Sequence, residues 1–165
     1  MRKRAAGFTL TELVTVIAII GLLALLLMPA AARIKLYSQR VRCMSNLRSL
    51  HVAASQYLQE YQSWPQITMS SNSEADYTAK WIAIFQPFGI TAKTWTCPSI
   101  QRDAVNETPS GSIPQRDYAA GTFGTGRMTP FKWSTQPWFF ELANVHGKGN
   151  LIVFPDGSVK ALDDI

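Results

Sequence analysis

The feature that most constrains this chain is an uncharged, largely apolar run from Leu13 to Ala32. Its 20 residues are enough for a helix to span about 30 Å of hydrocarbon. Glu12 stands directly before the run, and a carboxylate without a partner is costly in hydrocarbon. The sequence therefore predicts a membrane-inserted helix with an acidic residue at its start.

A secretory signal peptide is the main alternative for this run. The small residues at 30–32 imitate a cleavage site, and a signal peptide would be removed there. Its apolar core is usually shorter, however, and Gly7 and Phe8 precede the run here. We therefore favour a helix that stays in the membrane.

Helical periodicity continues beyond the apolar run. Residues 33–62 contain neither glycine nor proline, and apolar side chains recur three or four residues apart. These apolar residues are Ile34, Tyr37, Val41, Met44, Leu47, Leu50, Ala54, Tyr57 and Tyr61. With the run they predict about 50 residues of helix, which is ~75 Å. We expect Pro29 to break this helix by a bend or local melting over residues 25–29.

The remainder, from Trp64 onward, predicts a small folded domain. Trp64-Pro65 ends the helix, because a residue before proline disfavours helical dihedrals. A short helix is expected at residues 79–88. Strands are expected at residues 94–97, 118–123 and 138–142. Residues 150–162 predict a hairpin, since Asp156-Gly157 between two apolar runs favours a type I′ turn.

These patterns predict an α+β fold, in which a long N-terminal helix packs on a small antiparallel β-sheet with a C-terminal hairpin. The helix is transmembrane in its first half and amphipathic in its second. The expected segments are a basic leader at 1–7, the transmembrane half at 8–32, the amphipathic half at 33–63 and the globular α+β domain at 64–165.

The two cysteines, Cys43 and Cys97, lie far apart in the sequence. They show no CxxC spacing and no neighbouring histidine pair, so we expect no metal site. Outside the cytoplasm a disulfide is their natural state. It would close a loop of about 55 residues and contribute roughly 4 kcal/mol in the chain-entropy model. Two unpaired buried thiols are the alternative.

Charge and motifs argue against nucleic-acid binding and catalysis. The net charge is +5, but Arg2, Lys3 and Arg4 precede Gly7, so a chain cut after Gly7 carries 13 minus 11, or +2. No phosphate loop or nucleophile elbow is present in the sequence, so we expect no enzyme. The five tryptophans more often fill a core or an interface than stack on a ligand.

The stretch GFTLTEL at residues 7–13, behind a basic leader and before the apolar run, resembles the class III signal of type IV pilins and type II secretion pseudopilins. The resemblance implies that a prepilin peptidase cuts between Gly7 and Phe8 and methylates the new Phe8 amine. Glu12 then becomes the fifth residue and pairs with the Phe8 amine of a neighbouring subunit. Pro29 falls where pilins often break the helix.

A second resemblance lies near the C-terminus. His146, followed by nine residues and Asp156-Gly157, resembles the H-x9-DG segment of many prepilin-like proteins. We favour a structural His146 that anchors the hairpin to the core by a hydrogen bond. Calcium binding by Asp156 with backbone oxygens is the alternative, because related pseudopilins bind calcium in their C-terminal loops. No other cofactor is expected.

The pilin resemblance implies a structural subunit that assembles through its helix into a type II secretion pseudopilus or a type IV pilus-like filament. Its partners are a prepilin peptidase, other pilin or pseudopilin subunits and the assembly platform of the bacterial inner membrane. The processing motif needs a cytoplasmic N-terminus, with the domain extracytoplasmic. Three cationic residues precede the run and five follow it. By the positive-inside rule this count favours the reverse orientation, with the domain on the cytoplasmic side.

A second hypothesis remains open. It describes a monomeric, membrane-anchored binding module outside the cytoplasm, whose aromatic-rich domain presents a ligand surface.

Overall fold

The structure is a computed structural model. It describes residues 9–67, 74–100, 116–124, 129–147 and 149–165, without the side chains of Leu26, Pro29, Ala32, Ala75 and Thr129. Contacts divide the chain into two units, Met1–Ser38 and Gln39–Ile165. The long helix α1, Leu10–Tyr61, contributes its N-terminal part to the first unit and its C-terminal part to the second.

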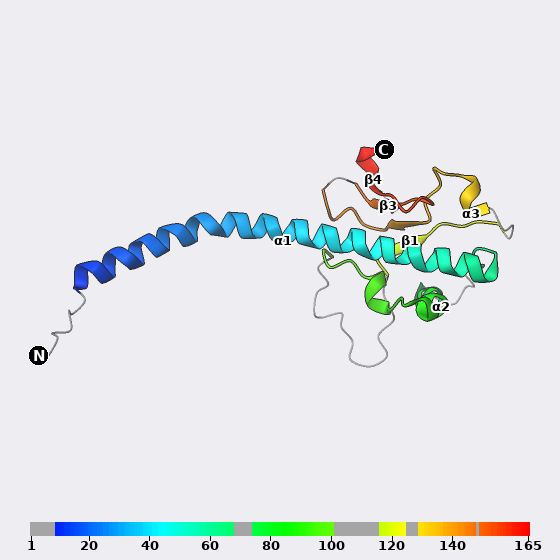
Figure 1. Ribbon diagram of the computed structural model, residues 1–165, viewed down its shortest axis with the longest axis horizontal. Coiled ribbons are helices and arrows are strands. Elements are labelled where there is room, and N and C mark those ends of the chain that lie inside the picture. The colour runs from blue at the N-terminus through cyan, green and yellow to red at the C-terminus, as the bar shows by residue number, and fades with distance from the viewer. Residues whose placement is uncertain (1–8, 68–73, 101–115, 125–128, 148) are drawn as a thin grey trace, which may run out of the picture. The chain divides into compact units, whose positions relative to one another are not determined.

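Helix α1 is continuous over 52 residues (Figure 1). Pro29 lies inside it, so of the two expected outcomes over residues 25–29 the local melting is wrong, while Figure 1 shows α1 curved in its first half, as the expected bend requires. Proline removes one backbone hydrogen bond, and the alanines and leucines around it are strong helix formers that continue the helix. The helix ends at Tyr61, ahead of Trp64-Pro65 as predicted, where Gln62 takes a positive φ of 59°.

The membrane span expected over residues 8–32 is not supported: among the described residues, no helix is long and apolar enough to cross a membrane.

The second unit combines the end of α1 with short helices and one sheet. The helical elements are α2 (Glu74–Phe85), η1 (Gln86–Phe88), η2 (Ala92–Trp95), α3 (Thr129–Lys132) and η4 (Leu162–Asp164). The strands are β1 (Tyr118–Ala120), β2 (Phe139–Glu141), β3 (Leu151–Val153) and β4 (Val159–Ala161). They form an antiparallel sheet in the order β1-β2-β3-β4, which confirms the predicted α+β class.

One predicted strand, at residues 94–97, is wrong. The chain forms the 3-10 helix η2 there instead. The Thr94 N–H donates to the Thr91 carbonyl at 2.9 Å, and the Thr94 hydroxyl accepts from the Thr91 N–H at 3.4 Å. These local bonds satisfy the backbone within a turn and compete with strand pairing.

The core of the second unit is aromatic. Trp64, Trp81, Trp95 and Trp138 are at most 2% exposed, whereas Trp133 is 55% exposed. Of the predicted stripe only Leu47, Leu50 and Ala54 are buried, whereas Ile34, Tyr37, Val41 and Tyr61 are exposed, so the buried side of α1 is shifted and shorter than predicted. The buried side chains of α1 form one stripe in its C-terminal half. They are Cys43, Leu47, Leu50, Ala53, Ala54 and Leu58. This stripe lies against α2 on one side and the sheet on another (Figure 1).

The C-terminal hairpin forms at the predicted place, but its turn differs. The Gly157 N–H donates to the Phe154 carbonyl at 2.9 Å, and Gly157 has a φ of 79° while Asp156 does not have a positive φ. A type I′ turn needs positive φ at both central residues, and Pro155 cannot adopt it because its ring fixes φ near −65°. A negative-φ turn followed by a left-handed glycine closes this hairpin instead.

One partly buried ion pair joins α2 to the start of β1. Arg116 donates from Nε and Nη2 to Oε1 of Glu74, at 2.9 and 2.6 Å. Its guanidinium also lies 4.7 Å from the centre of the Tyr77 ring. The Arg116 side chain is only 9% exposed, but Glu74 is 62% exposed, so solvent reaches the contact from the carboxylate side.

Candidate functional site

The N-terminal motif is described from Thr9 onward; Gly7 and Phe8, the predicted cleavage residues, lie outside the described residues. Helix α1 starts directly behind them at Leu10. Every residue whose side chain is described between Thr9 and Ser38 is exposed.

Glu12 and Thr9 form a reciprocal cap on the start of α1. Oε2 of Glu12 accepts the Thr9 N–H at 2.8 Å and the Thr9 hydroxyl at 2.6 Å. The Glu12 N–H in turn donates to the Thr9 hydroxyl oxygen at 3.3 Å. This is the capping box, in which the first and fourth residues of a helix start satisfy each other's N–H groups. The acidic residue thus has partners inside its own chain.

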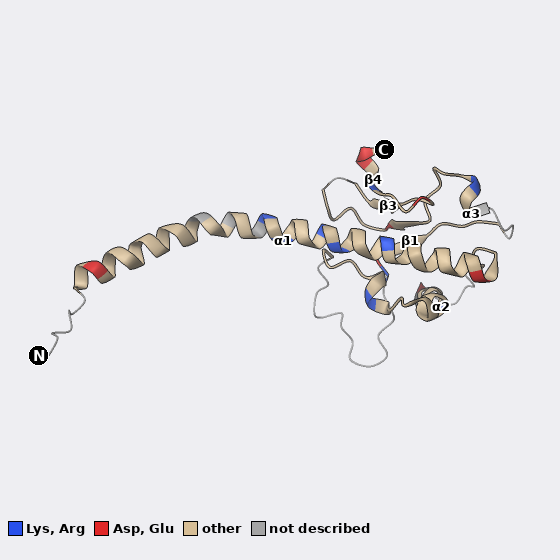
Figure 2. Ribbon diagram, in the orientation of Figure 1, with Lys and Arg blue, Asp and Glu red and all other residues tan. Residues whose placement is uncertain are grey.

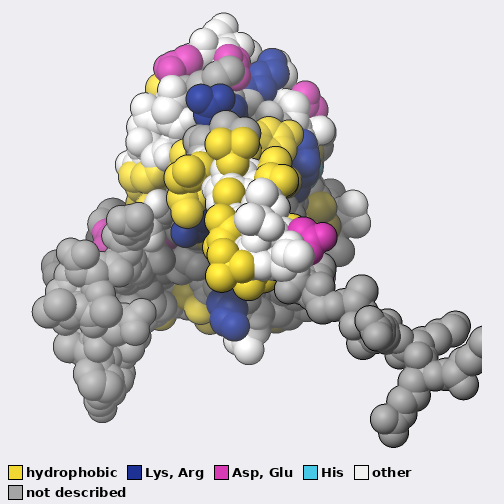
Figure 3. Space-filling view, turned by 90° about the vertical axis from the view of Figure 1, so that its left-hand side faces the viewer, with side chains coloured by type: hydrophobic (Ala, Val, Ile, Leu, Met, Phe, Trp, Pro, Cys, Tyr) yellow, Lys and Arg dark blue, Asp and Glu magenta, His cyan; other side chains and the backbone are white. Residues whose placement is uncertain are grey.

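The first unit exposes a large apolar surface. Figure 2 shows an acidic residue near the start of α1, followed by no charge among the described residues until basic residues appear in its middle. Figure 3 shows hydrophobic side chains gathered over α1. The exposed large apolar residues of α1 up to Val41 are Leu10, Leu13, Val14, Val16, Ile17, Ile19, Ile20, Leu22, Leu23, Leu25, Leu27, Met28, Ile34, Leu36, Tyr37 and Val41.

The two cysteines form a disulfide, as the sequence predicted. The Cys43–Cys97 bond joins α1 to the segment after η2, and the two Cα atoms are 5.5 Å apart. This separation lies within the usual range for disulfides. The bond ties the helix to the globular unit close to the start of that unit at Gln39.

His146 and Glu141 lie beside this disulfide in the interior. Nε2 of His146 is 3.1 Å from Oε1 of Glu141 and 3.6 Å from Sγ of Cys97. Oε2 of Glu141 accepts the Leu151 N–H of β3 at 3.0 Å. The His146 and Glu141 side chains are 3% and 1% exposed, and burial raises the pKa of the Glu141 carboxyl above its ordinary value. His146 therefore reaches the hairpin through Glu141.

Direct anchoring of the hairpin to α1 comes from His51, a role that sequence reasoning missed. Nε2 of His51 lies 2.9 Å from the Pro155 carbonyl oxygen. The His51 ring also stacks on Trp138 with ring centres 4.7 Å apart. A Cβ atom added to Gly157 would lie 3.3 Å from the His51 ring. The signal available in the sequence was the position of His51 beside the buried stripe, next to Leu50.

Asp156, the residue considered for calcium, is engaged locally. Its Oδ1 accepts the Ser158 N–H at 2.8 Å. The described part of the chain holds one group of three or more closely spaced His, Cys, Asp and Glu side chains, formed by Cys43, Cys97, Glu141 and His146. Asp156 is outside that group.

Comparison with known proteins yields one match. A family model described as the prokaryotic N-terminal methylation motif matches residues 2–28. The curated proteins and the solved structures give no match. The matched region does not reach His146 or Asp156, so the H-x9-DG resemblance remains an expectation from the sequence. The N-terminus of this chain is a type IV pilin-like prepilin signal.

Proposed function

We propose that this chain is a prepilin-type structural subunit. A prepilin peptidase cuts between Gly7 and Phe8 and methylates the Phe8 amine. The processed subunits assemble through α1 into a filament of the type II secretion pseudopilus or type IV pilus kind. The observation that carries the proposal is the methylation motif at residues 2–28, which leads directly into a long helix.

The surface of α1 supports an assembly role. Exposed apolar side chains extend from Leu10 to Val41, far more than a soluble monomer exposes in one patch. Such a surface is stable when lipid or neighbouring helices cover it. The methylation motif supports anchoring at the inner membrane before assembly, with the leader cytoplasmic and the globular unit outside.

The position of Glu12 favours a subunit that assembles into a filament over a monomeric membrane-anchored module. After cleavage it is the fifth residue, four positions from the new amine of Phe8. Thr9 gives the Glu12 carboxylate hydrogen bonds but no opposite charge, and a cationic amine of the next subunit would supply that charge. The pairing also fixes how far one helix is shifted along the next.

Intact mass spectrometry of the membrane-extracted protein tests the processing step. We expect loss of residues 1–7 and one added methyl group when a prepilin peptidase is co-expressed. A catalytically inactive peptidase is the control and leaves the full chain. A wild-type chain that keeps residues 1–7 beside an active peptidase contradicts the proposal.

The binding-module hypothesis has less support. Trp64, Trp81, Trp95 and Trp138 are buried, so they present no ligand surface. Photo-crosslinking from Leu22, which is 62% exposed, separates the two hypotheses in cells. The subunit proposal expects crosslinks between copies or to other pilin-like chains, and a binding module without self-association gives none.

A further inference from the structure

We infer that Cys43, Cys97, Glu141 and His146 form a zinc site in the reduced chain, at the place that the disulfide occupies in the oxidised chain. The inference concerns the globular unit and does not depend on the proposed processing or assembly.

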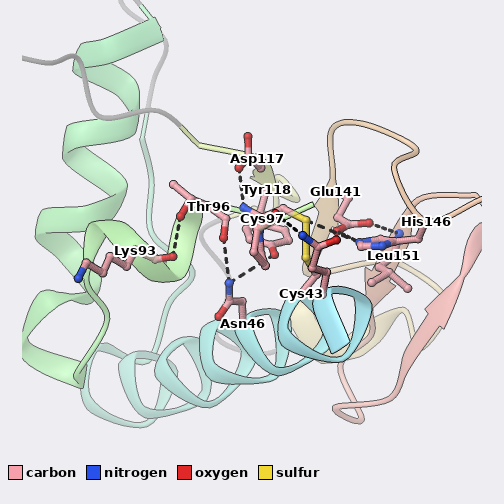
Figure 4. Close-up of a disulfide and its surroundings, with 12 residues drawn as sticks. Cys43, Asn46, Lys93, Thr96, Cys97, Asp117, Tyr118, Glu141, His146 and Leu151 are labelled. Carbon is pink, nitrogen blue, oxygen red and sulfur yellow. Dashed lines mark hydrogen bonds and ion pairs between the residues drawn. A yellow bond between two sulfur atoms is a disulfide. The ribbon is translucent and has the colours of Figure 1, made fainter. Parts of the chain in front are cut away.

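The four side chains converge from separate parts of the second unit. Cys43 lies on α1, Cys97 follows η2, Glu141 ends β2 and His146 lies between β2 and β3. Figure 4 shows Glu141 and His146 pointing toward the disulfide. One ligand atom from each residue lies within 4.8 Å of the others. Sequence spacing could not reveal this group, because the fold alone brings the four residues together.

The two distances from His146 Nε2 are close to those of a tetrahedral zinc ion. Zinc binds thiolate sulfur at about 2.3 Å and imidazole nitrogen or carboxylate oxygen at about 2.0–2.2 Å, so a tetrahedron has sulfur–nitrogen edges of about 3.6 Å and nitrogen–oxygen edges of about 3.4 Å. The structure has 3.6 Å between Cys97 Sγ and His146 Nε2, and 3.1 Å between that Nε2 and Glu141 Oε1. The sulfurs need only separate to about 3.8 Å, which rotation of the two side chains supplies.

The donor set and its surroundings also suit zinc. Two thiolates, one imidazole and one carboxylate are all common zinc ligands, and structural sites bind four of them in a closed shell. The two cysteines are 0% and 1% exposed, and the Glu141 and His146 side chains are 1% and 3% exposed. The Leu151 N–H holds Oε2 of Glu141 and so orients the carboxylate, as outer partners do in metal sites.

Burial of a carboxylate and an imidazole costs free energy unless the two groups are paired. In the oxidised chain Glu141 and His146 pair with each other at 3.1 Å, and Glu141 also accepts the Leu151 N–H at 3.0 Å. The pair therefore holds both side chains in place next to Cys97 before any ion binds.

The change between the two states is a balanced exchange. A dithiol reductant gives two electrons and two protons to the Cys43–Cys97 bond, becomes a disulfide itself and leaves two thiols. Zn²⁺ then displaces the two thiol protons and binds the two thiolates, Glu141 Oε1 and the lone pair on Nε2 of neutral His146.

A groove lies next to Cys97, whose side chain is itself buried. It has a volume of about 400 Å³, and its lining includes Arg42, Asn46, Lys93, Thr96 and Cys97. The two cations attract an incoming thiolate, which is the attacking species in thiol–disulfide exchange. Attack on Cys97 releases Cys43 as the leaving thiolate.

Metal titration of the full-length chain in detergent micelles tests the site. The protein is reduced with a phosphine, freed of metal with a chelator and titrated with Zn²⁺ against a chromophoric competitor, and separately with Co²⁺. We expect one ion per chain, with the absorption of thiolate–cobalt bonds and of tetrahedral Co²⁺. The oxidised protein should bind no ion at this position. Equal binding by the oxidised chain, or cobalt spectra without thiolate absorption, overturns the inference.

Matched variants locate the ion. His146→Gln and Glu141→Gln should each weaken zinc binding by at least about tenfold. Glu60→Gln, which replaces an exposed glutamate outside the group, should bind zinc as the wild type does. Unchanged affinity in both His146→Gln and Glu141→Gln overturns the site as assigned, since only the two thiolates would then hold the ion.

Circular dichroism covers the case in which reduction loosens the fold. If the reduced apo chain loses structure, Zn²⁺ should restore it, because metal binding and folding are linked. A reduced chain that stays unfolded with excess Zn²⁺ also overturns the inference.

Discussion

Replacement of Glu12 by glutamine separates two roles of this side chain. In the structure Oε2 of Glu12 accepts the Thr9 N–H at 2.8 Å and the Thr9 hydroxyl at 2.6 Å, and a glutamine carbonyl can accept the same bonds. In the proposed filament the charge of Glu12 pairs with the Phe8 amine of a neighbour, which glutamine cannot do. Glu12→Gln therefore keeps the helix cap and removes the charge pair.

The two roles differ in magnitude. A helix cap contributes about 1 kcal/mol, which is roughly fivefold in an equilibrium constant. A charged carboxylate in the apolar part of a membrane costs about 3 kcal/mol on insertion scales, and relief of that cost on pairing drives assembly by roughly 10²-fold. We therefore expect Glu12→Gln to reduce filament assembly by roughly 10²-fold.

Thr9→Val is the matched variant, because it removes the hydroxyl from the cap and leaves the carboxylate. It should reduce assembly by about fivefold at most. Assembly is measured as the ratio of sheared filament to membrane-bound subunit by quantitative mass spectrometry, after intact mass has shown that each variant is processed. If Glu12→Gln assembles as the wild type does and Thr9→Val fails, Glu12 acts through the helix cap and our account of its charge is wrong.

Three further predictions concern the globular unit. Gly157→Ala should destabilise it by about 1–2 kcal/mol in a denaturant titration, because the residue has a φ of 79° and its Cβ would lie 3.3 Å from the His51 ring. Arg116→Lys should cost less than about 1 kcal/mol, because it loses one of two hydrogen bonds to a carboxylate that is 62% exposed. Lys80→Ala removes a pair exposed on both sides and should change stability by less than about 0.5 kcal/mol. Hydrogen bonds from Ser158 lower the pKa of Asp156 below its ordinary 3.8, so the ionised Asp156 stabilises the fold above about pH 4, and this stabilisation is lost as the pH falls through the folded-state pKa. Asp156→Asn should therefore reduce the loss of stability between neutral and acidic pH. If the stability of Asp156→Asn falls with acid as steeply as that of the wild type, the role given to Asp156 is wrong.

The sequence predicted those parts of the fold that depend on neighbours along the chain. The apolar stripe without glycine or proline predicted α1 to its end near Trp64, and Asp156-Gly157 marked the hairpin at its observed position. The N-terminal signal could also be predicted from the sequence, because seven consecutive residues carry it. Each of these signals is local.

The sequence failed where one local preference overrode another or where contacts are distant. Pro155 excluded the turn type that Asp156-Gly157 favours, and threonine bonds closed η2 in place of a strand. Pro29 did not melt α1 locally. The group around the disulfide spans more than a hundred positions from Cys43 to His146, so no spacing rule could find it. The fold itself was needed to bring those side chains together.

The place of the disulfide has a mechanical consequence for the proposed subunit. Cys43 lies on α1 shortly after the second unit begins at Gln39, and the buried stripe follows it from Leu47 to Leu58. In a filament built on α1, any force on the globular unit reaches the helix through this region. A covalent bond at the start of this region prevents α1 from separating from the rest of the globular unit. Without the bond, the hydrophobic contacts of the stripe could break one at a time. A metal ion bound to the same cysteines would keep that connection in the reduced chain, because it links Cys43 to both Cys97 and the sheet. Either state therefore holds the globular unit to the helix that assembles.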